Sequence, residues 1–383
     1  MEADDLELLL SGALAPLRSF GVDPAISLAL PDGLSEVELV DPEGMPVAVV
    51  YADGALRPLA AHVTGAFRRL YLSPAQVQEA YPGYLTVPVA AALTDADLAS
   101  IDGARAPGQG VVLLTLAGTG TPQGLSGVGL IRASLAAAET LGNAAVVAVA
   151  LASHGDPETD HRLGQVVVGN YAGAGGVVAV TGVGDHPAAI AAVIDQDQPP
   201  VGERGLVVFF TGLSGSGKST LARALHDRIL ESGGRTVTSL DGDVVRRNLS
   251  AGLTFSKEDR ETNIQRIGWV AAEISRHRGI AICSPIAPFD STRQHVRRDV
   301  EAAGGTFFLV HVSTPLAECE RRDKKGMYAK ARAGIIPEFT GISSPYEAPL
   351  DADVVVDTTG ISIEEALDRV IVALAREDVL DLE

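Results

Sequence analysis

The chain has 383 residues, of which 46% are hydrophobic and 21% are charged, a balance typical of a folded globular protein. Its 49 acidic and 30 basic residues give a formal net charge of -19. This charge repels polyanions, so we expect no nucleic-acid partner. The two cysteines are too few for a disulfide framework. The N-terminus is acidic, unlike that of a signal peptide, and no apolar run is long enough to span a membrane, so we expect a cytoplasmic protein with no membrane partner.

The first part of the chain has the pattern of a β-rich module. Short alternating apolar runs such as VELVD and PVAVVYADG are broken by proline and glycine at short intervals. Further on, apolar runs at 111–117, 145–151 and 177–180 alternate with Gly-rich and Ala-rich helical stretches, which predicts a small α/β unit. We therefore expect one domain at residues 1–104 and a second at 105–195.

The segment DQDQPPVGER at 195–204 predicts the main domain boundary, because it combines two prolines, a glycine and charges between well-patterned regions. After it, strands are expected at 206–211, 236–240, 280–284, 306–312 and 353–357. Helices are expected between them, including one over 257–279 that ends at a capping glycine. Strands that are apolar on both faces and alternate with helices predict an α/β fold with a doubly wound parallel sheet at 203–383.

A phosphate-binding motif follows the first of these strands. The octapeptide GLSGSGKS fits G-x-x-x-x-G-K-[ST] and stands between a strand and a helix, as the chemistry requires. Backbone N–H groups and the helix N-terminus would bind phosphate oxygens, Lys218 would reach the β- and γ-phosphates of ATP, and Ser219 would bind Mg²⁺. The predicted ATP-binding residues are Gly212, Leu213, Ser214, Gly215, Ser216, Gly217, Lys218, Ser219 and Thr220.

Two aspartates follow the next strand. Asp241 and Asp243 stand where open α/β sheets place their ligands, at the carboxyl end of a strand. A carboxylate there can hold Mg²⁺ or accept the proton of an attacking hydroxyl. We expect Asp241 to contribute to the metal site and Asp243 to act as the base.

Residues 203–383 as a whole resemble adenylyl-sulfate kinases (APS kinases), with the motifs GLSGSGKST, DGDVVRRNLSAGLTFSKEDRETNIQRIG, IAPFDSTRQHVR and ECERRDKKGMYAKARAGIIPEFTGISSPYEAP. The resemblance implies a P-loop kinase that phosphorylates the ribose 3′-hydroxyl of adenylyl sulfate (APS) with ATP and Mg²⁺. It implies Lys218, Asp243 and the lid residue Lys325 as catalytic groups. It implies APS contacts from Asp243, Arg246, Phe255, Arg260, Asn263, Ile286, Phe339, Gly341 and Ile342, with the adenine stacked between the two phenylalanines.

Some of these residues could also have purely structural roles. Phe255 and Phe339 could be ordinary core residues, and Arg260 and Asn263 are three apart on a predicted helix and could form a solvated face. Asp290 stands where many relatives have arginine, which removes one expected anion contact.

Residues 6–20, LELLLSGALAPLRSF, look like the opening of ATP sulfurylases, whose first module is PUA-like. That family's catalytic stretch contains two histidines, whereas the nearest equivalent here, GTGTPQGLSG at 118–127, has none. We therefore expect a degenerate sulfurylase-like region that serves dimerisation, stability or docking to a separate ATP sulfurylase. The chain as a whole is expected to form a homodimer. Two alternatives are kept, a bifunctional synthetase with residual sulfurylase activity and a non-catalytic regulator that binds APS or nucleotide.

Overall fold

The computed structural model describes residues 2–41, 44–59, 66–121, 124–254, 256–323 and 326–382, without the side chains of Glu2, Asp243 and Val244. The chain divides into two compact units, Met1–Gln198 and Pro199–Glu383. Of the helices in these ranges, none combines the length and the apolar character needed to cross a bilayer.

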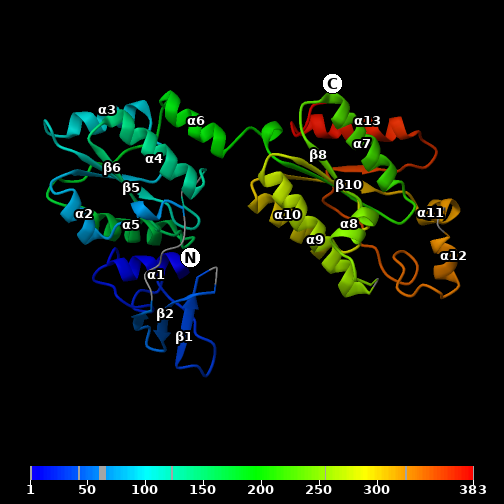
Figure 1. Cartoon of the computed structure of the whole chain (residues 1–383), viewed down its shortest axis with the longest axis horizontal. Coiled ribbons are helices and arrows are strands. Elements are labelled where there is room, and N and C mark those ends of the chain that lie inside the picture. The colour runs from blue at the N-terminus through cyan, green and yellow to red at the C-terminus, as the bar shows by residue number, and fades with distance from the viewer. Residues whose placement is uncertain are drawn as a thin grey trace. The chain divides into compact units, whose positions relative to one another are not determined.

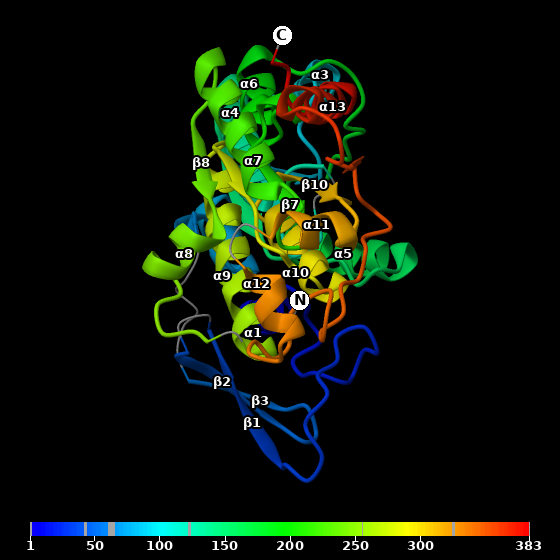
Figure 2. The same ribbon diagram turned by 90° about the vertical axis from the view of Figure 1, so that its right-hand side faces the viewer.

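The N-terminal unit contains two small sheets. The first is antiparallel, in the order β1-β2-β3, and is seen in Figure 2. The second is parallel, in the order β4-β5-β6. The elements of the unit are α1 (Glu2–Ser11), β1 (Glu36–Val40), β2 (Pro46–Tyr51), β3 (Leu56–Pro58), η1 (Arg68–Leu70), α2 (Pro74–Ala80), β4 (Leu85–Val89), α3 (Asp95–Ala104), β5 (Val111–Leu116), α4 (Gly127–Leu141), β6 (Ala144–Val149), α5 (Pro157–Tyr171) and α6 (Ala188–Asp197).

One hydrophobic core runs through both sheets of this unit. Leu8 of α1 and Val50 of β2 belong to the same buried cluster as Leu114 of β5 and Val167 of α5. The sequence-based division at residue 104 falls inside this unit, and β4, which was assigned to the β-rich module, pairs with β5 instead. Because the two parts bury their apolar faces against each other, they form one compact body.

Residues 177–180, expected as a strand, do not form one. The run makes only an isolated parallel bridge between Thr86 and Val177. Val177 is exposed, and two hydrogen bonds, to Gly176 and from Val178, link the run to Thr86. The run is four residues long, lies at the edge of the sheet and is preceded by glycines. It therefore makes too few hydrogen bonds to the neighbouring strand to form a longer strand.

The C-terminal unit is a single parallel sheet in the order β11-β10-β7-β9-β8, covered by helices on both faces (Figure 1). This arrangement confirms the predicted doubly wound fold. The elements are η2 (Val201–Glu203), β7 (Leu206–Thr211), α7 (Lys218–Ser232), β8 (Val237–Leu240), α8 (Gly242–Asn248), α9 (Lys257–Arg276), β9 (Ile280–Cys283), α10 (Asp290–Ala302), β10 (Thr306–Val312), α11 (Leu316–Arg322), α12 (Met327–Arg332), β11 (Val354–Val356) and α13 (Ile363–Arg376).

Strand β7 shows how the two faces are built. All six of its residues are buried, with Val208 and Phe210 packed in the core under α7 and α13, and Val207 and Phe209 packed under α9 and α10. Side chains alternate across a strand, so a strand covered on both faces must be apolar throughout. Because β7 lies between β9 and β10, it also marks the point where the strand order reverses, which is where such sheets bind ligands.

The end of α9 differs from the expectation in one detail. The left-handed residue that terminates the helix is Arg278, with a φ of 62°, and Gly279 follows it. Gly279 donates its N–H to the Ile274 carbonyl at 3.1 Å, and a Cβ at this position would lie 2.9 Å from Ile274 Cγ2. The glycine is therefore required for close packing rather than for its backbone conformation.

Gly268 on α9 provides a test of the packing between α9 and α10. A Cβ at this position would lie 2.6 Å from Cγ2 of the buried Val296 on α10. We expect Gly268→Ala to destabilise the C-terminal unit by about 1–3 kcal/mol, because overpacking outweighs the gain in helix propensity. The measurement is the midpoint temperature of thermal unfolding. The transition of the C-terminal unit is recognised because added nucleotide raises its midpoint. Adding Val296→Ala should recover part of the loss, and a fully additive double variant would contradict the contact.

Candidate active site

The predicted phosphate-binding loop is formed as expected between β7 and α7. Gly212, Gly215 and Gly217 have φ values of 146°, 75° and 106°, which favour glycine. A Cβ on Gly212 would lie 2.4 Å from the Val312 carbonyl oxygen, so this position also requires the smallest residue because of its contact with β10. Ser219 and Thr220 are exposed in the first turn of α7.

Lys218 is the buried cation of the loop. Only 6% of the residue is exposed, and its Nζ donates to the Leu213 carbonyl at 2.7 Å. Burial lowers the pKa of Lys218 to about 8, and the nearby Cys319 and Asp241 oppose this shift. The ammonium group of Lys218 is therefore poorly solvated and lies in the phosphate-binding loop. A bound anion would stabilise its charge by Coulombic attraction.

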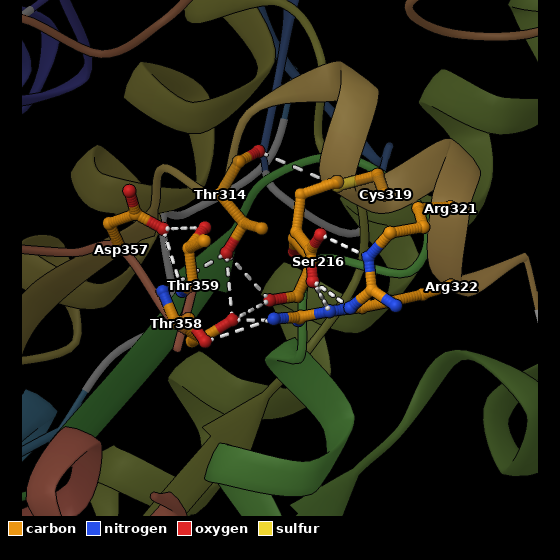
Figure 3. Close-up of polar contacts among 9 residues, drawn as sticks. Ser216, Thr314, Cys319, Arg321, Arg322, Asp357, Thr358 and Thr359 are labelled. Carbon is orange, nitrogen blue, oxygen red and sulfur yellow. Dashed lines mark hydrogen bonds and ion pairs between the residues drawn. The ribbon is translucent and has the colours of Figure 1, made fainter. Parts of the chain in front are cut away.

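The carbonyl groups of the loop are held from outside it. Tyr328 of α12 donates its hydroxyl to the Ser214 carbonyl at 2.8 Å. Thr314 and Thr358 both donate to the Ser216 carbonyl, at 3.0 and 2.9 Å (Figure 3). Sequence analysis missed these three residues. Each of the two threonines is the second residue after a strand, β10 or β11, so the rule that singled out Asp241 could have found them.

Asp241 lies at the carboxyl end of β8, as predicted, and accepts a hydrogen bond from Ser284 Oγ at 3.1 Å. It is close enough to Lys218 to influence that residue's pKa. Asp243 is in the first turn of α8, and its side chain lies outside the described part of the structure. Within the described residues, no three His, Cys, Asp or Glu side chains come together as a metal site.

Asn263 is buried and Arg260 is mostly buried on α9, which excludes the solvated-face interpretation. The Arg260 side chain is 15% exposed and donates to the Glu338 carbonyl at 3.0 Å and to Thr340 Oγ1 at 3.2 Å. Asn263 is 5% exposed. Buried Nε of Arg260 and buried Oδ1 of Asn263 have no hydrogen-bond partner among the described residues. An unpaired buried polar atom costs about 1–3 kcal/mol, so both atoms are suited to a polar ligand.

The remaining predicted substrate residues are distributed as follows. Arg246 of α8 donates to the Thr254 carbonyl at 3.3 Å. Phe339 is 9% exposed, and its ring packs edge-on against Tyr328 at a centroid distance of 5.0 Å. The Ile286 carbonyl accepts a hydrogen bond from Thr211 Oγ1 at 2.6 Å. Phe255 and Lys325 lie outside the described residues, so the predicted adenine stack and the lid lysine stay predictions.

An open pocket of about 560 Å³ lies beside the phosphate loop. It is lined by Leu213, Gly341, Ile342, Ser343, Ser344, Pro345 and Tyr346, which includes three of the predicted binding residues. Gly341 has a φ of 88°, and a Cβ there would lie 3.0 Å from Leu213 Cδ2. The 339–346 segment therefore packs against the loop closely enough to form one binding region with it.

Asp290, the departure from the family pattern, has a structural partner. Its Oδ1 lies 3.2 Å from Nη2 of Arg293, a residue that is 1% exposed and also donates to the Ala287 carbonyl at 2.9 Å. The carboxylate at position 290 thus balances a buried cation in α10 and supports the loop that carries Ile286.

The comparisons with known proteins bear directly on this unit. Residues 204–357 match the family model described as adenylylsulphate kinase. The chain carries an adenylylsulphate kinase domain. A curated relative from Aspergillus terreus, named sulfate adenylyltransferase, is 46% identical over 196 residues, which are 51% of this chain and 34% of the relative. The chain spans about a third of the length of the curated relatives it matches.

One solved structure extends the likeness to nearly the whole chain. A hexameric APS kinase from Thiobacillus denitrificans is 25% identical, with a TM-score of 0.75 over 99% of this chain and 92% of its own. An APS kinase from Mycobacterium tuberculosis, solved in complex with AMPPNP and APS, is 44% identical over 45% of this chain and 98% of its own, with a TM-score of 0.43. The arrangement of an N-terminal unit before the kinase domain is therefore shared with the first of these proteins.

The N-terminal unit offers a different environment at the corresponding strand end. Helix α4 begins at Gly127, the last residue of the stretch at 118–127, and Asp197 accepts hydrogen bonds there from Ser126 N at 2.7 Å and from Ser126 Oγ at 2.5 Å. A Cβ on Gly129 would lie 2.4 Å from the Asp197 carboxyl carbon. The helix N-terminus, which would otherwise favour an anionic ligand, is thus already next to a carboxylate of the chain itself.

The pKa of Lys218 predicts how nucleotide binding depends on pH. The amine is protonated below about 8 and neutral above it, and only the protonated form attracts phosphate. We expect the affinity for ATP to fall as the pH rises through this value, measured by calorimetry on the full chain. Lys218→Met should bind ATP more weakly and without this transition. An unchanged pH profile in Lys218→Met would assign the transition to another group.

Asn263 provides a test of the substrate side. We expect Asn263→Ala to raise the KM for APS about 10- to 100-fold, because a hydrogen bond to the ligand is lost, while the KM for ATP changes little. Steady-state kinetics with each substrate varied in turn make the distinction. Gln265→Ala, at an exposed position of the same helix, is the matched control. An equal rise in both KM values would indicate a general disturbance of α9 instead.

Proposed function

We propose that this protein transfers the γ-phosphate of ATP to the ribose 3′-hydroxyl of APS, giving 3′-phosphoadenylyl sulfate and ADP. The observation that carries the proposal is the combination, in one adenylylsulphate kinase domain, of an intact phosphate loop with buried, unpaired polar atoms on Arg260 and Asn263. The M. tuberculosis kinase that shares 44% identity was solved with an ATP analogue and APS together. This supports the same pair of substrates here.

The residues of the site suit this transfer. The loop N–H groups and Lys218 would hold the β- and γ-phosphates, and Arg246, Arg260 and Asn263 would hold APS, since guanidinium forks suit sulfate and phosphate. Asp243 is our candidate for the base that accepts the 3′-hydroxyl proton. Phosphoryl transfer requires little covalent chemistry from the protein, so positioning and electrostatics carry the catalysis.

Mg²⁺ fits the oxygen groups beside the loop. The exposed hydroxyl of Ser219 and the carboxylate of Asp241 are hard ligands of the kind that magnesium uses together with phosphates and water. Bound there, Mg²⁺ would supply positive charge that neutralises the charge developing on the phosphates during transfer.

The N-terminal unit is proposed to be an accessory without sulfurylase activity. The stretch at 118–127 has no histidine or arginine, and the carboxylate of Asp197 at the start of α4 would repel a polyphosphate. We propose that the chain self-associates, because the T. denitrificans kinase that shares both units is hexameric. The homodimer, the docking to a separate ATP sulfurylase and the cytoplasmic location stay predictions.

Turnover by the full chain tests the kinase function. We expect ATP-dependent conversion of APS to its 3′-phosphate, with Lys218→Ala lowering kcat by about 100- to 1,000-fold because a preorganised charge is lost. Arg228→Ala, a change of a cationic side chain at the far end of the same helix, is the control.

Tight binding of ATP and APS without turnover would overturn the kinase function and favour the non-catalytic regulator. Release of pyrophosphate from ATP and sulfate would leave the kinase function in place, but it would overturn the accessory role of the N-terminal unit and favour the bifunctional synthetase.

A further inference from the structure

The carbonyl oxygen of Ser216 is held by hydroxyl groups from two other loops (Figure 3). Thr314 follows β10 and Thr358 follows β11, and they stand 98 and 142 residues away from Ser216 in the sequence. The Thr358 N–H donates to Thr314 Oγ1 at 3.2 Å, so the two threonines are also joined to each other. The middle of the phosphate loop is thus fixed to the carboxyl ends of two further strands of the sheet.

Arg322 of α11 determines where the Thr358 hydroxyl directs its proton. Nη1 of Arg322 lies 2.8 Å from Thr358 Oγ1, and Nη2 lies 2.9 Å from the Thr358 carbonyl oxygen. A guanidinium group carries only donors, so Thr358 Oγ1 accepts from it, and its single proton is left for the Ser216 carbonyl at 2.9 Å or for Thr314 Oγ1 at 2.8 Å. The arginine thereby directs this hydroxyl toward Ser216 and Thr314.

Glu318 holds this arginine in place. Its Oε1 accepts from Nε of Arg322 at 2.8 Å, and both of its oxygens accept from Arg321 at 2.7 Å. Hydrogen bonds from Arg321 and then Arg322 lower the pKa of Glu318 to about 2, so it is a carboxylate at any pH where the enzyme works. A continuous series of contacts therefore runs from α11 through Thr358 to the loop.

The orientation of the Ser216 carbonyl determines that of the next N–H. A trans peptide is planar, so the Gly217 N–H points to the side opposite the Ser216 carbonyl. A Cβ on Gly217 would lie 3.3 Å from Thr358 Oγ1, which places the hydroxyl directly behind this glycine. N–H groups at this point of such loops are the ones that bind phosphate oxygens.

We propose that Thr358 is a positioning residue for nucleotide phosphates, and that together with Thr314 and Arg322 it forms a clamp on the Ser216–Gly217 peptide. The clamp keeps the Gly217 N–H directed at the phosphates and couples the position of α11 to the shape of the loop. The turnover part of this inference rests on the proposed kinase function, whereas the nucleotide-binding part does not.

Binding of magnesium AMPPNP to the full chain tests the clamp. Thr358→Val keeps the shape of the side chain but removes the acceptor of Arg322 Nη1 and one of the two hydroxyl donors to the Ser216 carbonyl, so we expect the Kd to rise about 10- to 100-fold. Thr358→Ser should restore the affinity to within about threefold, because it returns the hydroxyl. Thr359→Val is the matched control, since the exposed Thr359 hydroxyl bonds, among the residues that the structure describes, only to Asp357 in its own turn.

Kinetics add a second readout. In turnover assays, Thr358→Val should raise the KM for ATP and leave the KM for APS unchanged, whereas a general loss of folded protein would lower kcat and leave both KM values unchanged. If Thr358→Val does not fold, as judged by thermal unfolding, Thr314→Val removes the other hydroxyl from the same carbonyl and takes its place.

Wild-type affinity in Thr358→Val, or an equal loss in Thr359→Val, would overturn the proposal. If the wild-type chain binds AMPPNP but does not phosphorylate APS, the kinase function fails, and the binding comparison still decides whether the clamp exists.

Discussion

A phosphate-binding loop turns its N–H groups toward the ligand, and its carbonyl groups consequently need partners on the other side. In this chain, Lys218 contacts the Leu213 carbonyl, Tyr328 contacts that of Ser214, and Thr314 and Thr358 contact that of Ser216. Buried peptide groups without partners are costly, so the loop depends on these neighbours for its shape. This requirement ties α7, α11, α12 and the ends of β10 and β11 into one site.

The order of strands makes these contacts possible. Strand β7 is central, so the loop that follows it is reached from β9 on one side and from β10 and β11 on the other. Parallel strands end at the same edge of the sheet, which brings Asp241, Thr314 and Thr358 to that edge from three different segments. The long helix α9 carries Arg260 and Asn263, whose buried Nε and Oδ1 atoms have no hydrogen-bond partner among the described residues.

The N-terminal unit has the same general layout of parallel strands with helices, but a different polar design. At the start of α4 the chain supplies its own anion, Asp197, to the serine that caps the helix. The buried carboxylate of Asp97 is similarly satisfied by Thr94, Thr181 and Gly182. These carboxylates are satisfied by groups of their own unit, whereas Arg260 and Asn263 of the kinase domain leave buried polar atoms unpaired where APS is proposed to bind.

The sequence by itself determined the phosphate loop, the apolar strands and the doubly wound class, because a contiguous motif and a hydrophobic period are local properties that a chain displays without being folded. It also indicated Arg260 and Asn263, although only through their resemblance to a family. The sequence did not separate the first 195 residues correctly, since a core shared by α1, β2 and β5 depends on packing between distant segments. The clamp formed by Thr314, Thr358 and Arg322 was likewise decided only by the tertiary structure, because hydroxyl groups far apart in the chain acquire a common partner only when the strands that carry them become neighbours.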